Sequence, residues 1–274
     1  MITGKPKTRP RLLAIDLDGT LIDRSLVIEE PVKGAIAAAR RIGVEVVIVT
    51  GRMYRAAKPF ARELDLHGPI VCYQGAAIYL LDGDKRIGHT PLAQPVATAL
   101  VEKAKRDGIH PQLYFDDELY VEAINKYTKI YTDVAQVEAI VVPSLIGELQ
   151  RGRQSTKFVA VLEREDADAY TAEVKAFIGD RAYVTRSNPE FVEAVDPSVS
   201  KGTALRFVAA YLGIPLEETM AIGDAWNDVP MLALAGFGVA MGSAPPEVTV
   251  EADAVVGDAA HYGVAEAIER FVLE

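Results

Sequence analysis

The sequence predicts an α/β fold in which a parallel β-sheet is interrupted by a second, α+β unit. Continuous apolar runs, such as 12–15 and 44–49, alternate with stretches of helical spacing, which is typical of parallel strands buried on both faces. This pattern breaks off after Gly75 and returns near Ser200. A chain of 274 residues is long enough for both units.

The first part of the chain is predicted to run strand, helix, strand, helix. After the strand at 12–15, Pro31 suits the first turn of a helix that ends at Gly43. A β-branched strand at 44–49 and a helix at about 53–66 follow. In such a sheet, ligands bind at the carboxyl ends of the strands.

A β-hairpin is predicted at 76–89, with its turn at Asp82-Gly83. The chain then mixes two candidate helices with strand-like runs, which indicates a separate α+β insertion. We place the insertion at residues 91–189 and the core at 1–90 and 190–274. The candidate helices are 95–106 and 165–177, and the strand-like runs are 112–114, 119–123, 157–162, 182–185 and 191–195.

The parallel pattern returns near the C-terminus, which places these elements back in the core sheet. They are a helix at 200–212, a strand at 219–222, a helix at 230–235, a strand at 238–241 and a final amphipathic helix with Val264, Ile268 and Phe271 on its apolar face.

Composition narrows the class of partner. A net charge of −10 and a pI near 5.0 argue against binding to nucleic acid or an anionic membrane, so we expect small-molecule partners. Residues 1–11 are polar and lack the apolar segment of a secretory signal, and we expect a loose tail there and a cytoplasmic protein. The lone Cys72 is expected in a buried strand. The sequence does not indicate the oligomeric state.

The most informative residues are Asp16 and Asp18, which follow the first strand. Side chains alternate along a strand, so the intervening Leu17 points away and the two carboxylates are presented together, while Gly19 lets the chain turn sharply. Such a pair suits a cation or an electrophile. Taken alone, a motif this short is more often a solvated turn after a buried strand.

Three further motifs follow in order, each at a strand end or a helix start. They are Thr50-Gly51-Arg52, Ser200-Lys201-Gly202, and Gly223-Asp224-Ala225-Trp226-Asn227-Asp228. Each has an ordinary explanation by itself: a strand terminator, a solvated lysine, and a turn before a helix. Together, in this order, they are far more specific than any one of them alone.

This set of motifs resembles the haloacid dehalogenase (HAD) superfamily of phosphatases. The position of the insertion resembles the Cof-like members, which have a large α+β cap of the C2 type (IIB). The resemblance covers nearly the whole chain and implies a Rossmann-like HAD core with an inserted α+β cap domain. It extends to Tyr73-Gln74-Gly75-Ala76, to 199–205 and to 238–242.

The resemblance implies how the acids are used. Asp16 and Asp224 would hold Mg²⁺ together with the backbone carbonyl of Asp18, and Asp228 would be a further metal partner that acts through a water or through the direct ligands. Asp16 is the expected nucleophile, which forms an aspartyl-phosphate intermediate. Asp18 is the expected acid and base.

The remaining motif residues are expected to bind phosphate. Thr50 and the Gly51 amide would hydrogen-bond the phosphoryl group, and Lys201 would offset its charge. Arg52 and Asn227 are candidate substrate ligands, although Arg52 fits packing at the sheet edge equally well and Asn227 fits a helix cap. Gln74 has the same two interpretations as Arg52.

In the cap, Arg186, Ser187 and Asn188 would reach the substrate if the cap closes, or form an ordinary polar turn. Tyr127 and Tyr131, at helical spacing, are expected in the core. Two positions, Trp226 and Ser243, differ from the pattern of the family: Trp226 is expected to narrow the pocket or to form a subunit contact, and Ser243 to weaken an outer hydrogen bond.

The sequence thus predicts a Mg²⁺-dependent phosphatase of small phosphomonoesters, such as sugar phosphates. A phosphotransferase or phosphomutase would use the same core, and a non-catalytic phosphometabolite-binding protein is a further alternative. Asp18 and Asp224 argue against a metal-free dehalogenase. The missing Gly-x-Gly-x-x-Gly motif after the first strand argues against nicotinamide binding.

Overall fold

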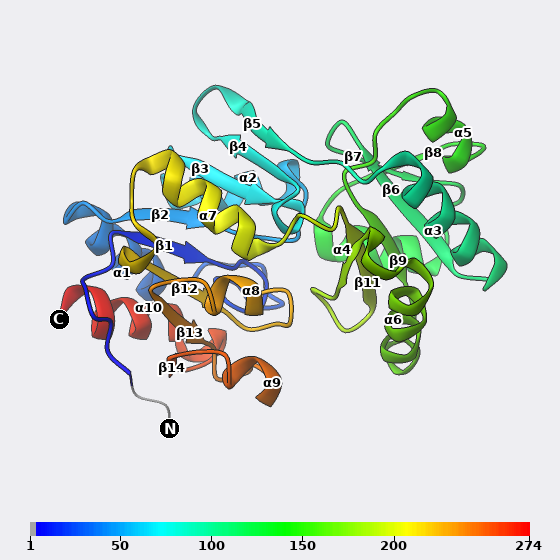
Figure 1. Cartoon of the computed structure of the whole chain (residues 1–274). Helices are drawn as coiled ribbons and strands as arrows, with labels where there is room; N and C mark the ends of the chain where they lie inside the picture. The colour runs from blue at the N-terminus through cyan, green and yellow to red at the C-terminus, as the bar shows by residue number, and fades with distance from the viewer. Residues whose placement is uncertain (1–3) are drawn as a thin grey trace.

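A computed structural model describes residues 4–274 of the protein. Its core is a five-stranded parallel sheet in the order β14-β13-β12-β1-β2. The strands are β1 (Leu12–Ile15), β2 (Glu45–Ile48), β12 (Thr219–Gly223), β13 (Phe237–Ala240) and β14 (Ala254–Val255). The predicted α/β class is confirmed, and β1 lies between the two strands that share the site with it (Figure 1).

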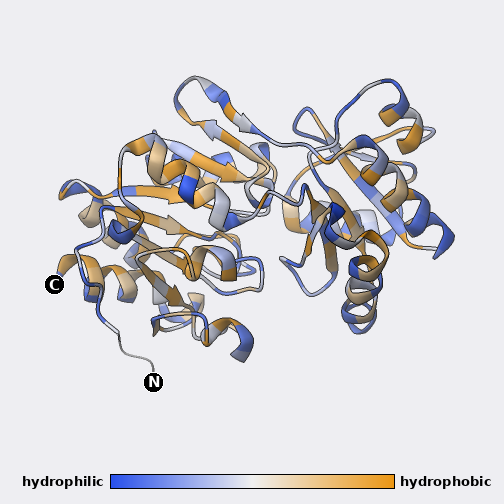
Figure 2. Ribbon diagram, in the orientation of Figure 1, coloured by the Kyte–Doolittle hydropathy of each residue, from blue (hydrophilic) through white to orange (hydrophobic). Residues whose placement is uncertain are grey.

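Both faces of this sheet are covered by helices. Because side chains alternate along β1, Leu13 and Ile15 pack on one face and Leu12 and Ala14 on the other. The first face carries α1 (Glu30–Arg41), α2 (Tyr54–Glu63) and α10 (Gly263–Ile268), and the second carries α7 (Lys201–Leu212) and α8 (Val229–Leu232). Figure 2 shows the apolar strands inside and the polar residues toward the surface.

The predicted hairpin is present in a small antiparallel sheet of β3 (Pro69–Cys72), β4 (Ala77–Leu80) and β5 (Lys85–His89). Its turn is a short helical segment, Asp82–Asp84, and Cys72 is buried in β3 as expected. A bridge between Val49 and Val71 connects this sheet to the core. The remaining core helices are short: α9 (Pro246–Thr249) and the turns at Tyr73–Gly75, Leu216–Glu218, Ala259–His261 and Glu269–Leu273.

The cap is built on a six-stranded sheet in the order β10-β11-β9-β6-β7-β8. Its strands are β6 (His110–Phe115), β7 (Glu118–Val121), β8 (Ala139–Val141), β9 (Phe158–Val161), β10 (Tyr183–Thr185) and β11 (Phe191–Val195). Outer-face residues pack with α3 (Gln94–Arg106), α5 (Leu145–Gln150) and α6 (Arg164–Ile178), and the inner face packs with α4 (Lys126–Ala135). In Figure 1 the cap forms a separate lobe beside the core.

The sequence patterns missed α4, α5 and β8. Helix α4 begins with a capping box between Asn125 and Thr128. It also carries an apolar stripe of helical spacing, so a signal for this helix was present in the sequence: Tyr127, Ile130, Tyr131, Val134 and Ala135. Helix α5 is six residues long, and β8 has three residues that are largely exposed. Elements as short as α5 and β8 carry too little periodicity to be recognised.

Strand pairing corrects the expected domain boundary at residue 190. Residues 191–195 form β11, which pairs with β9 inside the cap sheet. The chain therefore returns to the core after Val195, through residues 196–200 that precede α7. The first crossing runs through residues 90–93, between β5 and α3.

The expected loose tail is also corrected for the residues that the structure describes. The Gly4 amide donates to the Asp253 carbonyl at 3.1 Å, and the Thr8 hydroxyl donates to the Glu217 carbonyl at 2.8 Å. These contacts attach the segment to the core. The tail expectation for residues 1–3 lies outside the described residues.

In the described chain, residues 4–274, no helix combines the length and apolar character needed to cross a membrane.

Candidate active site

The candidate site lies at the carboxyl edge of the core sheet. Asp16 follows β1, Thr50 follows β2 and Asp224 follows β12. Because these three strands are parallel neighbours, residues that follow them meet at one edge. The fold therefore brings together motifs that are far apart in sequence.

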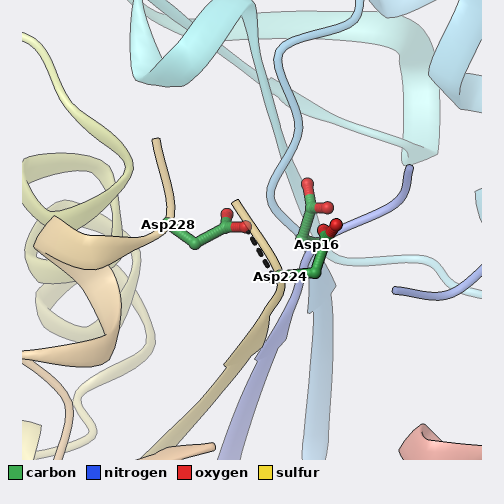
Figure 3. Close-up of side chains that lie close together, drawn as sticks. All are labelled: Asp16, Asp224 and Asp228. Atoms are coloured by element: carbon green, nitrogen blue, oxygen red, sulfur yellow. Dashed lines mark hydrogen bonds between the residues drawn. The ribbon is translucent and has the colours of Figure 1, made fainter. Parts of the chain in front are cut away.

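Three carboxylates form a cluster at this edge. Asp16, Asp224 and Asp228 each present an oxygen within 4.8 Å of the others (Figure 3). Asp228 stands just before α8, and its Oδ2 accepts hydrogen bonds from the amides of Asp224 and Ala225, both at 2.9 Å. These bonds fix the loop that carries Asp224.

Lys201 is the cation that contacts this cluster. Its buried ammonium group donates to Asp16 and, at 2.6 Å, to Oδ1 of Asp228. Ser200 caps α7 and so sets where Lys201 enters the site. Although burial opposes the charge, Asp16 and Asp228 raise the pKa of Lys201 above its ordinary value, so the lysine is charged.

One ammonium group does not balance three carboxylates. Burial, followed by the charge of Asp228, raises the pKa of Asp16 well above its ordinary value and raises the pKa of Asp224 to about 7. Their charged forms are thus unfavourable without a further cation. Buried carboxylate oxygens this close together suit a divalent metal ion.

Gly19 lets Asp224 approach the loop after β1. Its φ of +83° is a left-handed conformation that side chains disfavour, and a Cβ atom at this position would overlap Oδ2 of Asp224. The next residue, Thr20, donates from its hydroxyl to Oδ1 of Asp224 at 3.1 Å. Gly19 is thus needed both for the turn after β1 and for the close approach of Asp224.

Asp18 lies beside the carboxylate cluster and binds Arg52. The Nε and Nη2 atoms of Arg52 donate to the two carboxylate oxygens at 2.8 and 2.6 Å. The Arg52 side chain is 5% exposed, and that of Asp18 is 36% exposed. The Arg52 amide also donates to the Thr50 hydroxyl oxygen at 3.0 Å. The motif after β2 is therefore joined to the motif after β1.

A pocket opens over these residues, and its wall comes from both core and cap. Within residues 4–274, two buried polar atoms of the lining residues have no hydrogen-bond partner: Nη1 of Arg52 and Oδ1 of Asn227. Buried groups of this kind are expected where a ligand binds. The pocket is lined by Asp16, Asp18, Gly51, Arg52, Tyr131, Val134, Ala135, Lys157, Ser187, Asn188, Phe191, Glu193, Ala225 and Asn227.

The structure brings most of the predicted site residues together. Ser187 and Asn188 of the cap line the pocket, and Tyr131 is buried as expected but also faces it. Gln74 is fully buried, and its Oε1 accepts a hydrogen bond from Asn227 at 2.9 Å. Arg186 is outside the described pocket lining and is instead directed at Asp168 and Trp226.

Sequence reasoning missed Lys157 and Glu193. Both are cap residues, both line the pocket, and both are 1% exposed. A signal was available for Glu193, because it is a lone charge inside the apolar strand β11. Lys157 directly precedes the apolar strand β9 and has a weaker signal, because charged residues often flank strands.

The two departures from the family pattern have different settings. Trp226 is 43% exposed, with the Arg186 guanidinium 5.5 Å from its ring centre. It is absent from the described pocket lining, so the expected narrowing is not seen. Ser243 is exposed in a turn after β13.

Comparison with known proteins agrees with this geometry. The family model of haloacid dehalogenase-like hydrolases matches residues 13–268. Pyridoxal phosphate phosphatase YbhA of Escherichia coli K12 is 30% identical, with 94% of this chain and 97% of YbhA covered. The 5-amino-6-(5-phospho-D-ribitylamino)uracil phosphatase YcsE of Bacillus subtilis 168 is also 30% identical, with 96% of each chain covered.

The solved structure of BT4131, a sugar phosphatase of HAD subclass IIB, has a TM-score of 0.83 at 24% identity and covers 94% of this chain and 98% of its own. This likeness confirms the predicted fold with its IIB-type cap. The family match confirms the recognition made from the motifs, and the relatives confirm the predicted enzyme class of hydrolase and phosphatase. The chain belongs to the haloacid dehalogenase-like hydrolases.

Proposed function

We propose that the protein is a Mg²⁺-dependent phosphatase that hydrolyses small phosphomonoesters through an aspartyl-phosphate on Asp16. The observation that carries the proposal is the position of Asp16, which is buried at the end of β1, accepts a hydrogen bond from Lys201 and lies in a cluster with Asp224. A phosphate monoester is an anion, so attack by a carboxylate requires the negative charge at the site to be offset.

The donor set fits Mg²⁺. The oxygens of Asp16, Asp224 and Asp228 lie within 4.8 Å of one another, and this cation prefers a few carboxylates and keeps several waters. Asp16 and Asp224 would hold it directly, with the Asp18 backbone carbonyl, and Asp228 would complete the set. When bound, the cation supplies positive charge that the single ammonium group of Lys201 does not supply.

In the first half-reaction, a carboxylate oxygen of Asp16 attacks phosphorus while the bond from phosphorus to the leaving oxygen breaks. Asp18 gives its proton to that oxygen. In the second half-reaction, water attacks the phosphorus of the aspartyl-phosphate, Asp18 takes up the proton of the water, and phosphate and free Asp16 are released.

Five residues would bind the phosphoryl group and the substrate. The Thr50 hydroxyl and the Gly51 amide lie at the end of β2, and Lys201 offsets the charge beside Asp16. Two further groups are suited to substrate, the unpartnered Nη1 of Arg52 and Oδ1 of Asn227, both buried within the described chain. Each would gain a partner when substrate binds.

The leaving group would occupy the cap side of the pocket. There the wall has an apolar part, with Tyr131, Val134 and Phe191, and a polar part, with Ser187 and Asn188. A hydroxylated metabolite such as a sugar phosphate matches both parts. Because two relatives of equal identity are named for different substrates, the particular metabolite has to be measured.

The test is phosphate release from a panel of sugar phosphates, nucleotides, cofactor phosphates and one aryl phosphate, with Mg²⁺ or with a chelator. Release that requires Mg²⁺ and is lost in Asp16→Asn is the expected result. Absence of release from every member would contradict hydrolysis. Transfer of the phosphoryl group to an added sugar acceptor would then identify a phosphotransferase.

A further inference from the structure

A buried ion pair connects the cap to the core beside the candidate site. Lys157 and Glu193 each have a side chain 1% exposed, and Nζ of Lys157 lies 3.1 Å from Oε2 of Glu193. Alternation along β11 places Val192 and Ala194 in the outer cluster of the cap, so Glu193 faces inward to the core. The pair is therefore carried by the cap but buried against the core.

Each member of the pair binds a different core motif. Nζ of Lys157 donates to the carbonyl of Gly51 at 2.8 Å. Oε2 of Glu193 accepts from Nε2 of Gln74 at 2.9 Å, and Gln74 in turn accepts from Asn227 at 2.9 Å. These contacts form one chain of hydrogen bonds from the loop after β2 to the loop that carries Asp224.

Stability alone does not account for this pair. Removing two charges from water is costly, and well-packed apolar residues often stabilise a protein as much as a buried ion pair. What an ion pair adds is defined geometry. Burial opposes the charge on Lys157, yet Glu193 holds the pKa of Lys157 above its ordinary value, so the ammonium group is present to bind Gly51.

The contact between Lys157 and Gly51 affects the hydrogen bonding of the Thr50 hydroxyl. The carbonyl of Gly51 and the amide of Arg52 belong to one peptide group, which is planar. Lys157 donates to the oxygen of this peptide group. The N–H of the same group, which belongs to Arg52, donates to the Thr50 hydroxyl oxygen at 3.0 Å. With that oxygen accepting a hydrogen bond, the Thr50 hydroxyl proton is free to donate to another acceptor.

A second cap residue holds the other end of the same segment. Within the described chain, α2 has no side-chain cap of its own, but Asp117 accepts hydrogen bonds from the amides of Tyr54 at 2.8 Å and Arg55 at 2.9 Å. A carboxylate at a helix N-terminus is favourable. The cap thus contacts residues 51–55 at both ends.

We propose that Lys157 is a positioning residue that couples docking of the cap to the orientation of the Gly51–Arg52 peptide, and thereby of the Thr50 hydroxyl toward a phosphoryl group. The inference rests on the proposed phosphatase function. In the undocked state this peptide would lack its cap partner, so turnover depends on the cap being in place.

The test compares Lys157→Met, the double variant Lys157→Met/Glu193→Gln and a matched control, Lys103→Met. Lys103 is also a largely buried cap lysine in an ion pair, with Asp107 at 2.8 Å, but it lies in α3 on the outer side of the cap. Activity is measured as kcat and KM for 4-nitrophenyl phosphate with saturating Mg²⁺, and folding as the thermal unfolding temperature.

We expect Lys157→Met to lower kcat/KM about 10- to 100-fold, since a small misplacement of a binding group has effects of this size. The unpaired Glu193 will also lower the unfolding temperature. In the double variant, the amide that replaces the carboxylate is uncharged and can still accept from Gln74, so the unfolding temperature should recover while kcat/KM stays low. Lys103→Met should remain within about twofold of wild type in kcat/KM.

Recovery of kcat/KM together with the unfolding temperature in the double variant would overturn the inference, because Lys157 would then act through stability alone. An equal loss in Lys103→Met would also overturn it. Failure of the wild type to hydrolyse any substrate is a separate result, which contradicts the proposed function and is seen before any variant is compared.

Discussion

Both carboxylate oxygens of Asp18 accept hydrogen bonds from one guanidinium group, that of Arg52, at 2.6 and 2.8 Å. Bidentate pairing of this kind defines direction as well as distance. Arg52 is buried, and its guanidinium carbon lies 5.4 Å from the ring centre of Phe60. The arginine is therefore fixed in place and holds Asp18 at the wall of the pocket. Arg52 therefore sets the position of Asp18, and Asp18 has to free one of these oxygens from Arg52 before it can carry the proton that it would give as the acid.

The first prediction concerns Asp18 as the acid. Asp18→Asn keeps the size of the side chain but removes the proton that it would give to a leaving group. We expect phosphate release from an alkyl phosphate to fall about 10²- to 10⁴-fold. Release from an activated aryl phosphate, whose leaving oxygen needs no proton, should fall much less, provided that the first half-reaction limits its rate.

The matched control for this variant is Asp23→Asn, an exposed aspartate in the same loop. It should leave both rates unchanged. Where the first half-reaction limits the rate with both esters, equal losses for the aryl and the alkyl ester in Asp18→Asn would show that Asp18 is not the acid for the leaving group.

The second prediction concerns Asp16 as the nucleophile. Asp16→Asn should reduce turnover of every substrate by at least about 10³-fold, because the attacking carboxylate is gone. The fold should persist, since removing one of three clustered carboxylates lowers their mutual repulsion. Phosphate release and far-UV circular dichroism of the same sample measure both. Turnover near the wild-type rate would exclude an aspartyl-phosphate at this position.

The sequence predicts the core better than the cap, for a physical reason. Core strands such as β1 are buried on both faces and appear in the sequence as unbroken apolar runs. The sheet then determines the positions of the residues that directly follow these strands. Asp16 and Thr50 could therefore be predicted as neighbours. Lys157 and Glu193 could not, because their proximity to Gly51 depends on how the cap packs on the core.

The third prediction concerns the metal. A cation that binds the folded cluster stabilises it by mass action, by about 2.7 kcal/mol when its concentration is about 100 times the dissociation constant. Thermal unfolding with Mg²⁺ and with a chelator should differ accordingly. In Asp224→Asn this difference should shrink strongly, while in Asp253→Asn, an aspartate that binds the Gly238 amide away from the cluster, it should persist. A wild type that Mg²⁺ does not stabilise would argue against the cluster as a metal site.

The fourth prediction concerns pH and His89, which lies at the end of β5 with Nε2 3.0 Å from the hydroxyl of Thr156 in the cap. Burial, followed by the charge of Arg86, lowers the pKa of His89 below its ordinary value of 6.5. As pH falls below about 6.5, the unfolded chain takes up this proton before the folded chain does, so the stability of the protein decreases. His67 is the opposite case, because Asp82 and Asp65 raise its pKa and its stabilising effect is lost as pH rises.

The free energy of unfolding at about pH 8 minus that at about pH 5 should therefore be smaller in His89→Gln than in wild type, and larger in His67→Gln. Urea unfolding at the two pH values measures both differences, and comparison with wild type removes the contribution of the carboxylates, which titrate in every variant. An unchanged difference in His89→Gln would mean that this histidine titrates alike in the folded and unfolded chain, and that its burial against the cap is not maintained in solution.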